Sequence, residues 1–341
     1  MATAALPYLA TAPATRAHPR AVAVWLFAVA GLVFAMVVVG GITRLTESGL
    51  SIVKWNPIGG MVPPLNAAEW DTMFALYKAS PQYQMVNAGM SLAAFKGIFF
   101  WEWLHRLLGM SIGIVFAVPL LGFAVARWIP AGYGWRLTAL LALGGLQGAI
   151  GWWMVASGLV NRPSVAHERL AVHLVNALIL MSGCLWTALD LGDRRKRVDA
   201  RPSTWVVPFV ALLAVQIVWG AFTAGLRAGH ASDTWPLMFG QWVPELGSLI
   251  DDPVSVQFVH RTLAYGVALA ALSVAVVTFR AGAGRRAVAM AGLVVLQVTL
   301  GVLTIIHGVP IELAAAHQAV AALLLASTIW TAHWSVQGAR R

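Results

Sequence analysis

Long apolar runs constrain this chain more than any other feature. Each run approaches the ~20 residues that a helix needs to cross a bilayer. They lie at about 22–41, 98–126, 135–157, 167–190, 204–226, 255–279, 287–307 and 312–334. Irregular backbone cannot face lipid, because its polar groups would lack partners there, so each run is predicted to be a helix. Only 11% of the residues are charged, against about 25% in a soluble domain. The sequence therefore predicts an all-α polytopic membrane protein with eight transmembrane helices and membrane lipid as its surroundings.

The chain has a net charge of +10, and its basic residues lie mostly on one side of the predicted membrane topology. Basic residues gather in the two tails (1–21 and 335–341) and in the connections that an eight-helix topology places on the same side. They are Arg16, Arg20, Arg127, Arg136, Arg194, Arg195, Lys196, Arg197, Arg201, Arg280, Arg285, Arg286, Arg340 and Arg341. By the positive-inside rule, both termini are expected in the cytoplasm. This explanation needs no nucleic acid as a partner. The first run shows no clear cleavage site, so it is expected to be a retained anchor.

The two halves of the chain resemble each other. GGITRLTESGLSIVKW (40–55) aligns without gaps with GAFTAGLRAGHASDTW (220–235), and EWLHRLL (102–108) aligns with QFVHRTL (257–263). LQGAIG (146–151) aligns with LQVTLG (296–301) in the same order. We therefore predict two pseudo-symmetric four-helix bundles, 22–190 and 204–334, joined by a linker over 191–203. Both start on the same side, so the internal repeat is parallel, with its axis along the membrane normal.

The first outer loop is the largest difference between the halves. It spans about 42–97, whereas its counterpart spans about 227–254, and it is too polar to cross a membrane. Loops of this length are often functional. A simple cap over the bundle and a functional element both remain open for this loop.

Four histidines occupy matched positions in the two halves. His105 aligns with His260, and His173 aligns with His317. Each is expected about six residues into a helix that runs inward from the outer side, roughly 9 Å below its outer end. Ionisable residues inside membrane helices are rare and usually functional. We therefore predict that these histidines are ligands, two in each bundle.

The ligand count indicates which group they hold. Zinc takes three or four protein ligands, and no Cys, Asp or Glu accompanies each pair. An iron porphyrin needs only axial ligands and an apolar slot, which a four-helix bundle can supply. We predict one heme site in each half. His167 and His307 lie near the outer boundary without repeat partners, and rim residues and swinging ligands both remain open for them.

Charged neighbours accompany two of the predicted ligands. Arg106 and Arg261 directly follow His105 and His260, and either propionate binding or snorkelling to the interface explains them. Glu102 lies one helical turn before His105, on the same face, whereas the matched residue in the second half is Gln257. This asymmetry indicates that one half carries out chemistry and the other holds a cofactor. The alternative is an i,i+4 pair of Glu102 with Arg106, worth only ~0.2–0.5 kcal/mol.

The motifs GGITRLTESGLSIVKWNPIGG, EWLHR, VHR and AAAHQ resemble those of the heme A synthase family, from about residue 25 to 333. The resemblance implies a duplicated eight-helix fold and oxidation of the C8 methyl group of heme O to the formyl group of heme A, for cytochrome c oxidase. It implies that His260 and His317 bind a resident heme b and that His105 and His173 hold the substrate heme O. Glu102 matches the family's catalytic glutamate.

The same resemblance sets expectations for location and partners. The outer loop lacks the cysteine pair of some members, so the chain is similar to the cysteine-free proteobacterial and mitochondrial branch. We expect a bacterial inner membrane, with the heme sites toward the periplasmic side. Heme O synthase is the expected supplier, and cytochrome c oxidase assembly factors are expected partners. The electron donor and acceptor, the source of the formyl oxygen and the presence of a homo-oligomer remain open.

Two other functions also account for paired histidines. A di-heme b-type membrane cytochrome would transfer electrons without oxidising heme, but it leaves the Glu102/Gln257 difference and the long loop unexplained. A heme transporter or chaperone would need a path across the membrane, whereas the four histidines are predicted at one depth. The oxidative function is therefore preferred.

Overall fold

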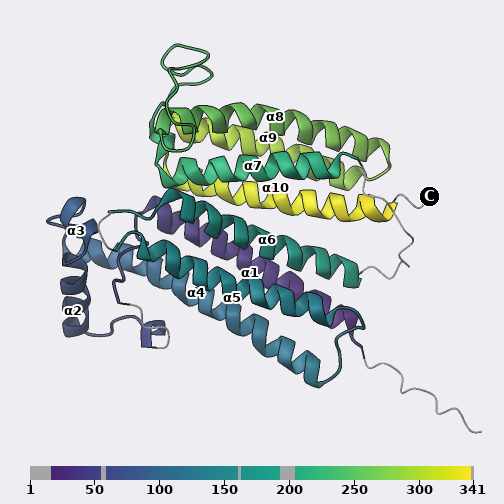
Figure 1. Cartoon of the computed structure of the whole chain (residues 1–341), viewed down its shortest axis with the longest axis horizontal. Helices are drawn as coiled ribbons and strands as arrows, with labels where there is room; N and C mark the ends of the chain where they lie inside the picture. Colours follow the sequence, from purple (N-terminus) through teal and green to yellow (C-terminus); the bar gives the residue numbers. More distant parts are fainter. Residues whose placement is uncertain (1–16, 55–58, 160–162, 193–203, 339–341) are drawn as a thin grey trace, which may run out of the picture.

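The computed structural model describes residues 17–54, 59–159, 163–192 and 204–338 (Figure 1). Regular structure in these residues is helical, apart from one isolated bridge between Met238 and Gln241. Eight of the described helices are long and apolar enough to cross a membrane. The predicted all-helical, multi-pass architecture is therefore confirmed. Most of the predicted linker, residues 1–16 of the N-terminal tail and residues 339–341 of the C-terminal tail lie outside the described residues.

The membrane-length helices follow the apolar runs closely. They are α1 (Pro19–Leu45), α4 (Leu92–Val125), α5 (Gly134–Ala156), α6 (His167–Gly192), α7 (Val206–Gly225), α8 (Pro253–Arg280), α9 (Gly284–Ile306) and α10 (Ile311–Gly338). Shorter elements occupy the loops: η1 (Gly59–Met61), α2 (Ala67–Lys78), α3 (Pro81–Met85) and η2 (Ala228–His230).

The start of α4 differs most from prediction. The apolar run indicated residue 98, but Ser91 caps the helix by accepting a hydrogen bond from the Ala94 backbone N–H, 3.2 Å away. Such a cap satisfies one of the free amides of a helix start. Because α1 also continues to Leu45, the first outer loop spans 46–91 rather than 42–97.

The eight long helices form two rings of four. In the first, α1 contacts α4 and α6, and α5 contacts the same two helices, so α4 and α6 lie opposite each other. In the second, α8 contacts α7 and α9, and α10 contacts the same two, so α8 and α10 lie opposite each other. Figure 1 shows the two sets beside each other. The equivalence of the halves as an internal repeat stays a prediction.

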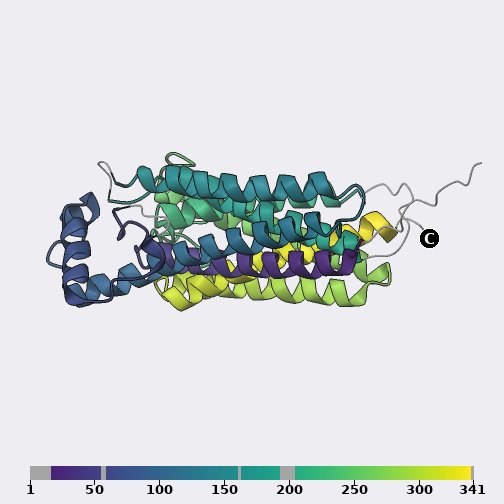
Figure 2. The ribbon, with the colours of Figure 1, turned by 90° about the horizontal axis from the view of Figure 1, so that it is seen from below.

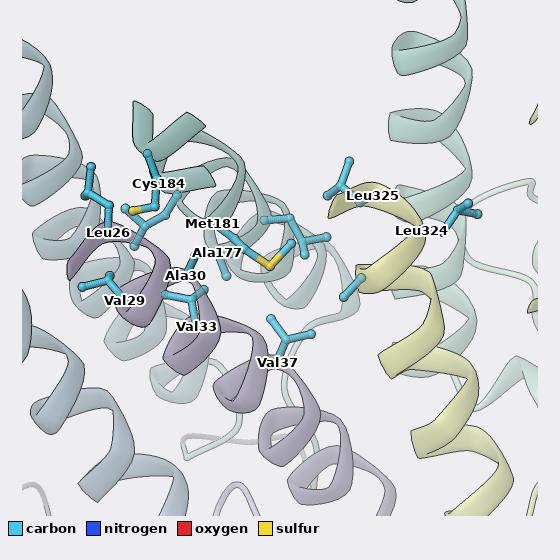
Figure 3. Close-up of a cluster of buried hydrophobic side chains, with 14 of the residues drawn as sticks. Leu26, Val29, Ala30, Val33, Val37, Ala177, Met181, Cys184, Leu324 and Leu325 are labelled. Atoms are coloured by element: carbon cyan, nitrogen blue, oxygen red, sulfur yellow. The ribbon is translucent and has the colours of Figure 1, made fainter. Parts of the chain in front are cut away.

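The rings meet through their most buried helices. A single hydrophobic cluster joins Leu26 and Val33 of α1, Met181 of α6 and Leu324 of α10 (Figure 3). The contacts between rings run from both α1 and α6 to both α7 and α10. In a membrane these apolar side chains exchange contact with lipid for contact with each other, so burial brings no hydrophobic gain. Close packing between the helices therefore holds the rings together.

Both described ends of the chain lie at one end of the bundle, as Figure 2 shows. We call the opposite end, which carries α2, α3 and residues 226–252, the loop end. There the first outer loop packs through an aromatic cluster of Phe74, Tyr77, Phe95 and Phe99. The loop is therefore a folded cap that rests on the start of α4.

A buried polar contact ties helices together at the end opposite the loops. Asp190 of α6 lies 2.5 Å from Arg136 of α5 and 2.9 Å from His333 of α10. The Asp190 carboxylate therefore joins both rings, far from the predicted ligands.

Candidate functional site

Each predicted ligand packs against a glycine of the neighbouring helix. A Cβ added to Gly40 of α1 would lie 3.2 Å from the His105 ring of α4, and one added to Gly151 of α5 would lie 3.0 Å from His173 of α6. The second ring repeats the arrangement. A Cβ on Gly220 of α7 would lie 3.1 Å from His260 of α8, and one on Gly301 of α9 would lie 2.9 Å from His317 of α10. The absence of these side chains lets each imidazole lie flat against a helix.

The four glycines place the histidines at a common depth. Gly40, Gly151, Gly220 and Gly301 each lie five residues before the last residue of their helix, at the loop end. At 1.5 Å per residue this is about 7.5 Å. His105 itself lies thirteen residues after the start of α4, rather than about six as predicted, because α4 extends beyond the other helices.

The histidines form one pair in each ring. His105 and His173 come from α4 and α6, which lie opposite each other in the first ring, and each packs against a glycine at the common depth. The same holds for His260 and His317 on α8 and α10 in the second ring. Each pair therefore faces the interior of its own ring, as expected of two axial ligands in a bundle.

Glutamine side chains contact the imidazoles of three of the four histidines. The Gln147 amide nitrogen lies 3.2 Å from Nδ1 and 3.1 Å from Nε2 of His173. Gln216 lies 3.1 Å from Nδ1 of His260, and Gln297 lies 3.3 Å from Nε2 of His317. These amides restrict rotation of the imidazoles that they contact.

The donor set fits an iron porphyrin. His317 Nδ1 lies 3.1 Å from the backbone carbonyl of Gln297, which can only accept a hydrogen bond. Nδ1 therefore carries the proton and Nε2 the lone pair, the tautomer that an iron ligand needs. The side-chain oxygens of Gln216 and Gln297 are buried without a partner among the described residues. After a 180° flip of the amide group, either oxygen can accept a hydrogen bond from an imidazole N–H.

Glu102 occupies a closed pocket beside only one histidine pair. Its side chain is buried, and one carboxylate oxygen accepts hydrogen bonds from the Ser51 hydroxyl and the Ile52 backbone N–H, both at 2.7 Å. The other oxygen accepts from Arg106, at 3.1 Å from Nε and 2.5 Å from an outer guanidinium nitrogen. The predicted Glu102–Arg106 pair is thus present, and the outer loop completes it.

The matched position in the second ring has a different chemistry. Gln257 donates to the backbone carbonyls of Gly229 and Ser232, at 3.1 and 2.9 Å. Arg261 donates to the carbonyls of Ser232 and Thr234, both at 2.9 Å. Both halves therefore use these positions to hold a loop over the bundle, but only the first half adds a negative charge.

The remaining histidines lie away from the pairs. His307 directly follows α9 and contacts the Leu303 carbonyl at 2.9 Å. His167 begins α6 and lies 3.6 Å from both Glu168 and Asp251. These three groups could surround a cation, but the positive end of the α6 dipole disfavours one there. Neither His167 nor His307 joins a histidine pair in this structure.

Fold and site together define a multi-pass membrane protein in which each of two helical rings presents a pair of histidines suited to a porphyrin. Residues 23–329 match the family described as COX15-CtaA, cytochrome oxidase assembly protein, and the chain belongs to this family.

Close relatives cover nearly the whole chain. The protein is 52% identical over 336 residues to the heme A synthase of Rhizorhabdus wittichii, covering 95% of this chain and 97% of the relative. It is 49% identical over 327 residues to the heme A synthase of Sphingopyxis alaskensis, covering 93% and 92%. It is 48% identical over 321 residues to that of Caulobacter vibrioides, covering 90% and 94%.

Several residues of the site were not predicted from the sequence. The glycines and glutamines behind the histidines were missed, although Gln147, Gly151, Gln297 and Gly301 fall in the aligned LQGAIG and LQVTLG segments. The spacing of glutamine and glycine by one helical turn was the available signal. The contact of Ser51 with Glu102 had no local signal, because 51 positions separate the two residues.

Proposed function

We propose that this protein is a heme A synthase, which oxidises the C8 methyl group of heme O to a formyl group and so supplies heme A to cytochrome c oxidase. Family membership and the near full-length relatives support this function. The observation that carries the assignment to particular residues is the Glu102 pocket, which lies beside one histidine pair and is replaced by an amide at the other.

The difference between Glu102 and Gln257 indicates which histidine pair would hold the substrate and which the resident heme. His105 and His173 would hold the substrate heme O, because Glu102 belongs to their ring. His260 and His317 would hold a resident heme b, since their ring offers ligands but no carboxylate at the matched position. When bound, heme b supplies one-electron redox chemistry. The glycines behind both pairs support the same ligand geometry in each site.

The hydrogen bonds of Glu102 distinguish its two candidate roles. Both oxygens already accept from Ser51, Ile52 and Arg106, so the carboxylate has little free capacity to take a proton from water. A fixed negative charge in a closed pocket stabilises positive charge that develops nearby. We therefore assign Glu102 to electrostatic stabilisation of the oxidised substrate and to holding the loop in place, in preference to general base catalysis.

Arg106 and Arg261 differ in the hydrogen-bond donors that they can offer to a heme propionate. Arg261 Nε is buried without a hydrogen-bond partner among the described residues, which leaves a donor for a carboxylate near the His260 site. Arg106 donates to Glu102 and, at 2.9 Å, to the Ile52 carbonyl. Propionate binding is therefore proposed for Arg261, and for Arg106 only together with its role at Glu102.

The proposed setting follows from charge and family. Arg127 follows α4 and Arg280 is the last residue of α8, and both lie at the end that also carries the termini. The positive-inside rule then places this end in the cytoplasm of a bacterial inner-membrane protein and the histidine pairs toward the periplasm. Heme O synthase as supplier, oxidase assembly factors as partners and a homo-oligomer belong to the same proposal.

The test is heme extraction and mass analysis of the purified full chain, expressed in membranes that also make heme O. Wild type should contain heme B together with heme A, and Glu102→Gln should contain heme B together with unreacted heme O. Heme B alone in both proteins would indicate a di-heme cytochrome and overturn the proposal. Normal heme A formation in Glu102→Gln would overturn the role of Glu102.

A further inference from the structure

The loop between α7 and α8 carries apolar side chains that the rest of the protein leaves exposed. It spans residues 226–252, and we call it the side loop, because it projects sideways from the end of α8, away from the first ring (Figure 1). Its exposed large apolar side chains are Trp235, Phe239, Trp242, Val243, Leu246, Leu249 and Ile250. Exposed apolar residues gathered in this way mark an interaction site.

The tip of the side loop presents a phenylalanine at a conformational cost. Met238 and Gln241 exchange backbone hydrogen bonds of 3.0 and 2.9 Å across a two-residue turn. Phe239, the first residue of this turn, has a φ of 52°, a left-handed conformation that glycine or asparagine adopts more readily. Its side chain is 59% exposed, so packing within the chain does not offset the cost. The position of Phe239 therefore indicates a contact outside the protein.

The side loop is continuous with the lipid-facing surface of α8. Exposed side chains recur three or four residues apart along this helix and so form one face: Tyr265, Leu269, Leu272 and Val276. Because α8 is one of the helices long and apolar enough to cross a membrane, this face lies against lipid. The indole N–H of Trp235 donates to the Tyr265 hydroxyl at 3.2 Å. The side loop therefore meets α8 on the face that lipid covers.

The tip of the side loop has no charged side chain. Residues 234–244, TWPLMFGQWVP, contain neither acidic nor basic residues. The tip therefore lacks the basic residues that bind anionic headgroups, and it offers a charged protein partner nothing to pair with. Its composition instead suits apolar contact at the boundary between lipid headgroups and acyl chains.

Hydrogen bonds fix the side loop to the helices on both sides of its tip. Arg261 of α8 donates to the backbone carbonyls of Ser232 and Thr234, both at 2.9 Å. The indole N–H of Trp219 in α7 donates to the Leu249 carbonyl at 3.3 Å. The apolar tip is therefore held in a defined position beside α8.

We propose that the side loop is a membrane-interface anchor, which inserts Phe239 and Trp242 into the lipid leaflet at the loop end. Tryptophan and tyrosine gather at the membrane interface, because each combines an apolar body with a polar group. The hydrogen-bonded pair of Trp235 and Tyr265 marks the level of this interface on the second ring. The occupant is lipid with neutral or zwitterionic headgroups, not a second copy of the chain. The inference rests on the membrane-spanning fold alone and is independent of the proposed function.

A spin label on the side loop tests this proposal. Val243→Cys adds a labelling site next to Trp242 without removing an aromatic side chain, and the native Cys184 is buried, so the label attaches to the introduced thiol. The full chain is studied in lipid nanodiscs of zwitterionic lipid. Electron paramagnetic resonance measures collisions of the label with oxygen, which concentrates in lipid, and with a water-soluble nickel chelate. Gln84→Cys of α3 is the reference for water, and Leu269→Cys of α8 is the reference for lipid.

The ratio of oxygen to nickel collisions at Val243→Cys should be several-fold higher than at Gln84→Cys and should approach that at Leu269→Cys. A ratio equal to that of Gln84→Cys would place the side loop in water and overturn the proposal. Few collisions with either reagent would show that a second copy of the chain covers the loop, which would also overturn it.

Two further substitutions test the aromatic side chains themselves. Phe239→Ser and Trp242→Ser together, in the Val243→Cys protein, should lower the collision ratio to that of Gln84→Cys, because the anchor is removed. Both side chains are exposed, so the fold is expected to stay intact. Met85→Ser, at an exposed apolar residue of α3, is the matched control and should leave the ratio unchanged. An unchanged ratio in the double variant would overturn the assignment of Phe239 and Trp242 as the anchor.

Discussion

Glu47 and Arg227 form an ion pair between the loops that follow α1 and α7. Their positions match in the alignment of the two halves, and both residues adopt left-handed backbone, with φ of 56° and 53°. Beside them, Arg44 donates to the last carbonyls of α7, at 3.1 Å from Ala224 and 2.7 Å from Gly225. The loops that follow α1 and α7, which match in the alignment of the two halves, therefore contact each other at the loop end and link the two rings.

This relationship predicts the outcome of a charge exchange. Glu47→Arg or Arg227→Glu alone should lower thermal stability by up to about 1 kcal/mol, the usual range for a pair that is partly exposed to water. The double exchange should restore most of the loss, because both positions have the same backbone conformation. The measurement is thermal unfolding of all four proteins in nanodiscs at low and high salt. A double variant no better than the worse single variant would contradict a direct pair.

The glycines behind the histidines predict site-selective loss of heme. Gly301→Ala places a methyl group 2.9 Å from the present His317 ring position, so the ring must move away from its neighbour. Heme content of the second ring should fall on the order of tenfold. Gly31→Ala of α1 is the control, since a Cβ there meets nothing within 4 Å. Alanine favours a helix over glycine, so global unfolding is not the expected cause.

The number of membrane helices was predictable, because the hydrophobicity of a segment largely determines whether it enters a bilayer. The placement of two histidines in each ring was also predictable, since the order of the helices restricted the choices, whereas their role as ligands stays a prediction. The start of α4 was missed, because its first turns pack on the outer loop rather than in lipid. Lys96, for example, lies 4.9 Å from the Trp70 ring centroid of α2.

The polar surroundings of the four proposed ligands were harder to predict from the sequence. Glu102 was recognised by its cost in a membrane, but its partners Ser51 and Ile52 come from a loop whose course depends on the packing of α2 and α3. Gln216 looks like an isolated polar residue in an apolar run. Only the contact between α7 and α8 reveals that it faces His260.

Acid pH should loosen the start of the helix that carries His260. The pKa of Asp252 lies below its ordinary value because the carboxylate accepts hydrogen bonds from the Ser255 hydroxyl and then from backbone N–H groups. A depressed pKa means that the cap contributes fully above the unfolded value of 3.8 and is lost as the pH falls below it.

Hydrogen exchange of the first turn of α8 between pH 6 and about pH 3 measures this effect. Asp252→Asn is the control, because asparagine caps a helix equally well but does not titrate in this range. The protection of wild type should fall toward low pH, after correction for the intrinsic exchange rate, while that of Asp252→Asn should stay level. Equal pH profiles for the two proteins would show that the Asp252 carboxylate has no such role.

Ser51 offers a test of Glu102 that leaves its charge in place. The Ser51 hydroxyl is buried and lies 2.7 Å from the Glu102 carboxylate, and a hydrogen bond to a charged group contributes about 1.5–3 kcal/mol. Ser51→Ala should therefore slow heme A formation roughly tenfold or more, without changing heme B content. Ser111→Ala on the same helix as Glu102 is the control, since within the described parts of the chain its hydroxyl donates to the Leu107 carbonyl and to no other group. If Ser51→Ala and Ser111→Ala form heme A at the same rate, the position of the carboxylate is not what limits the reaction.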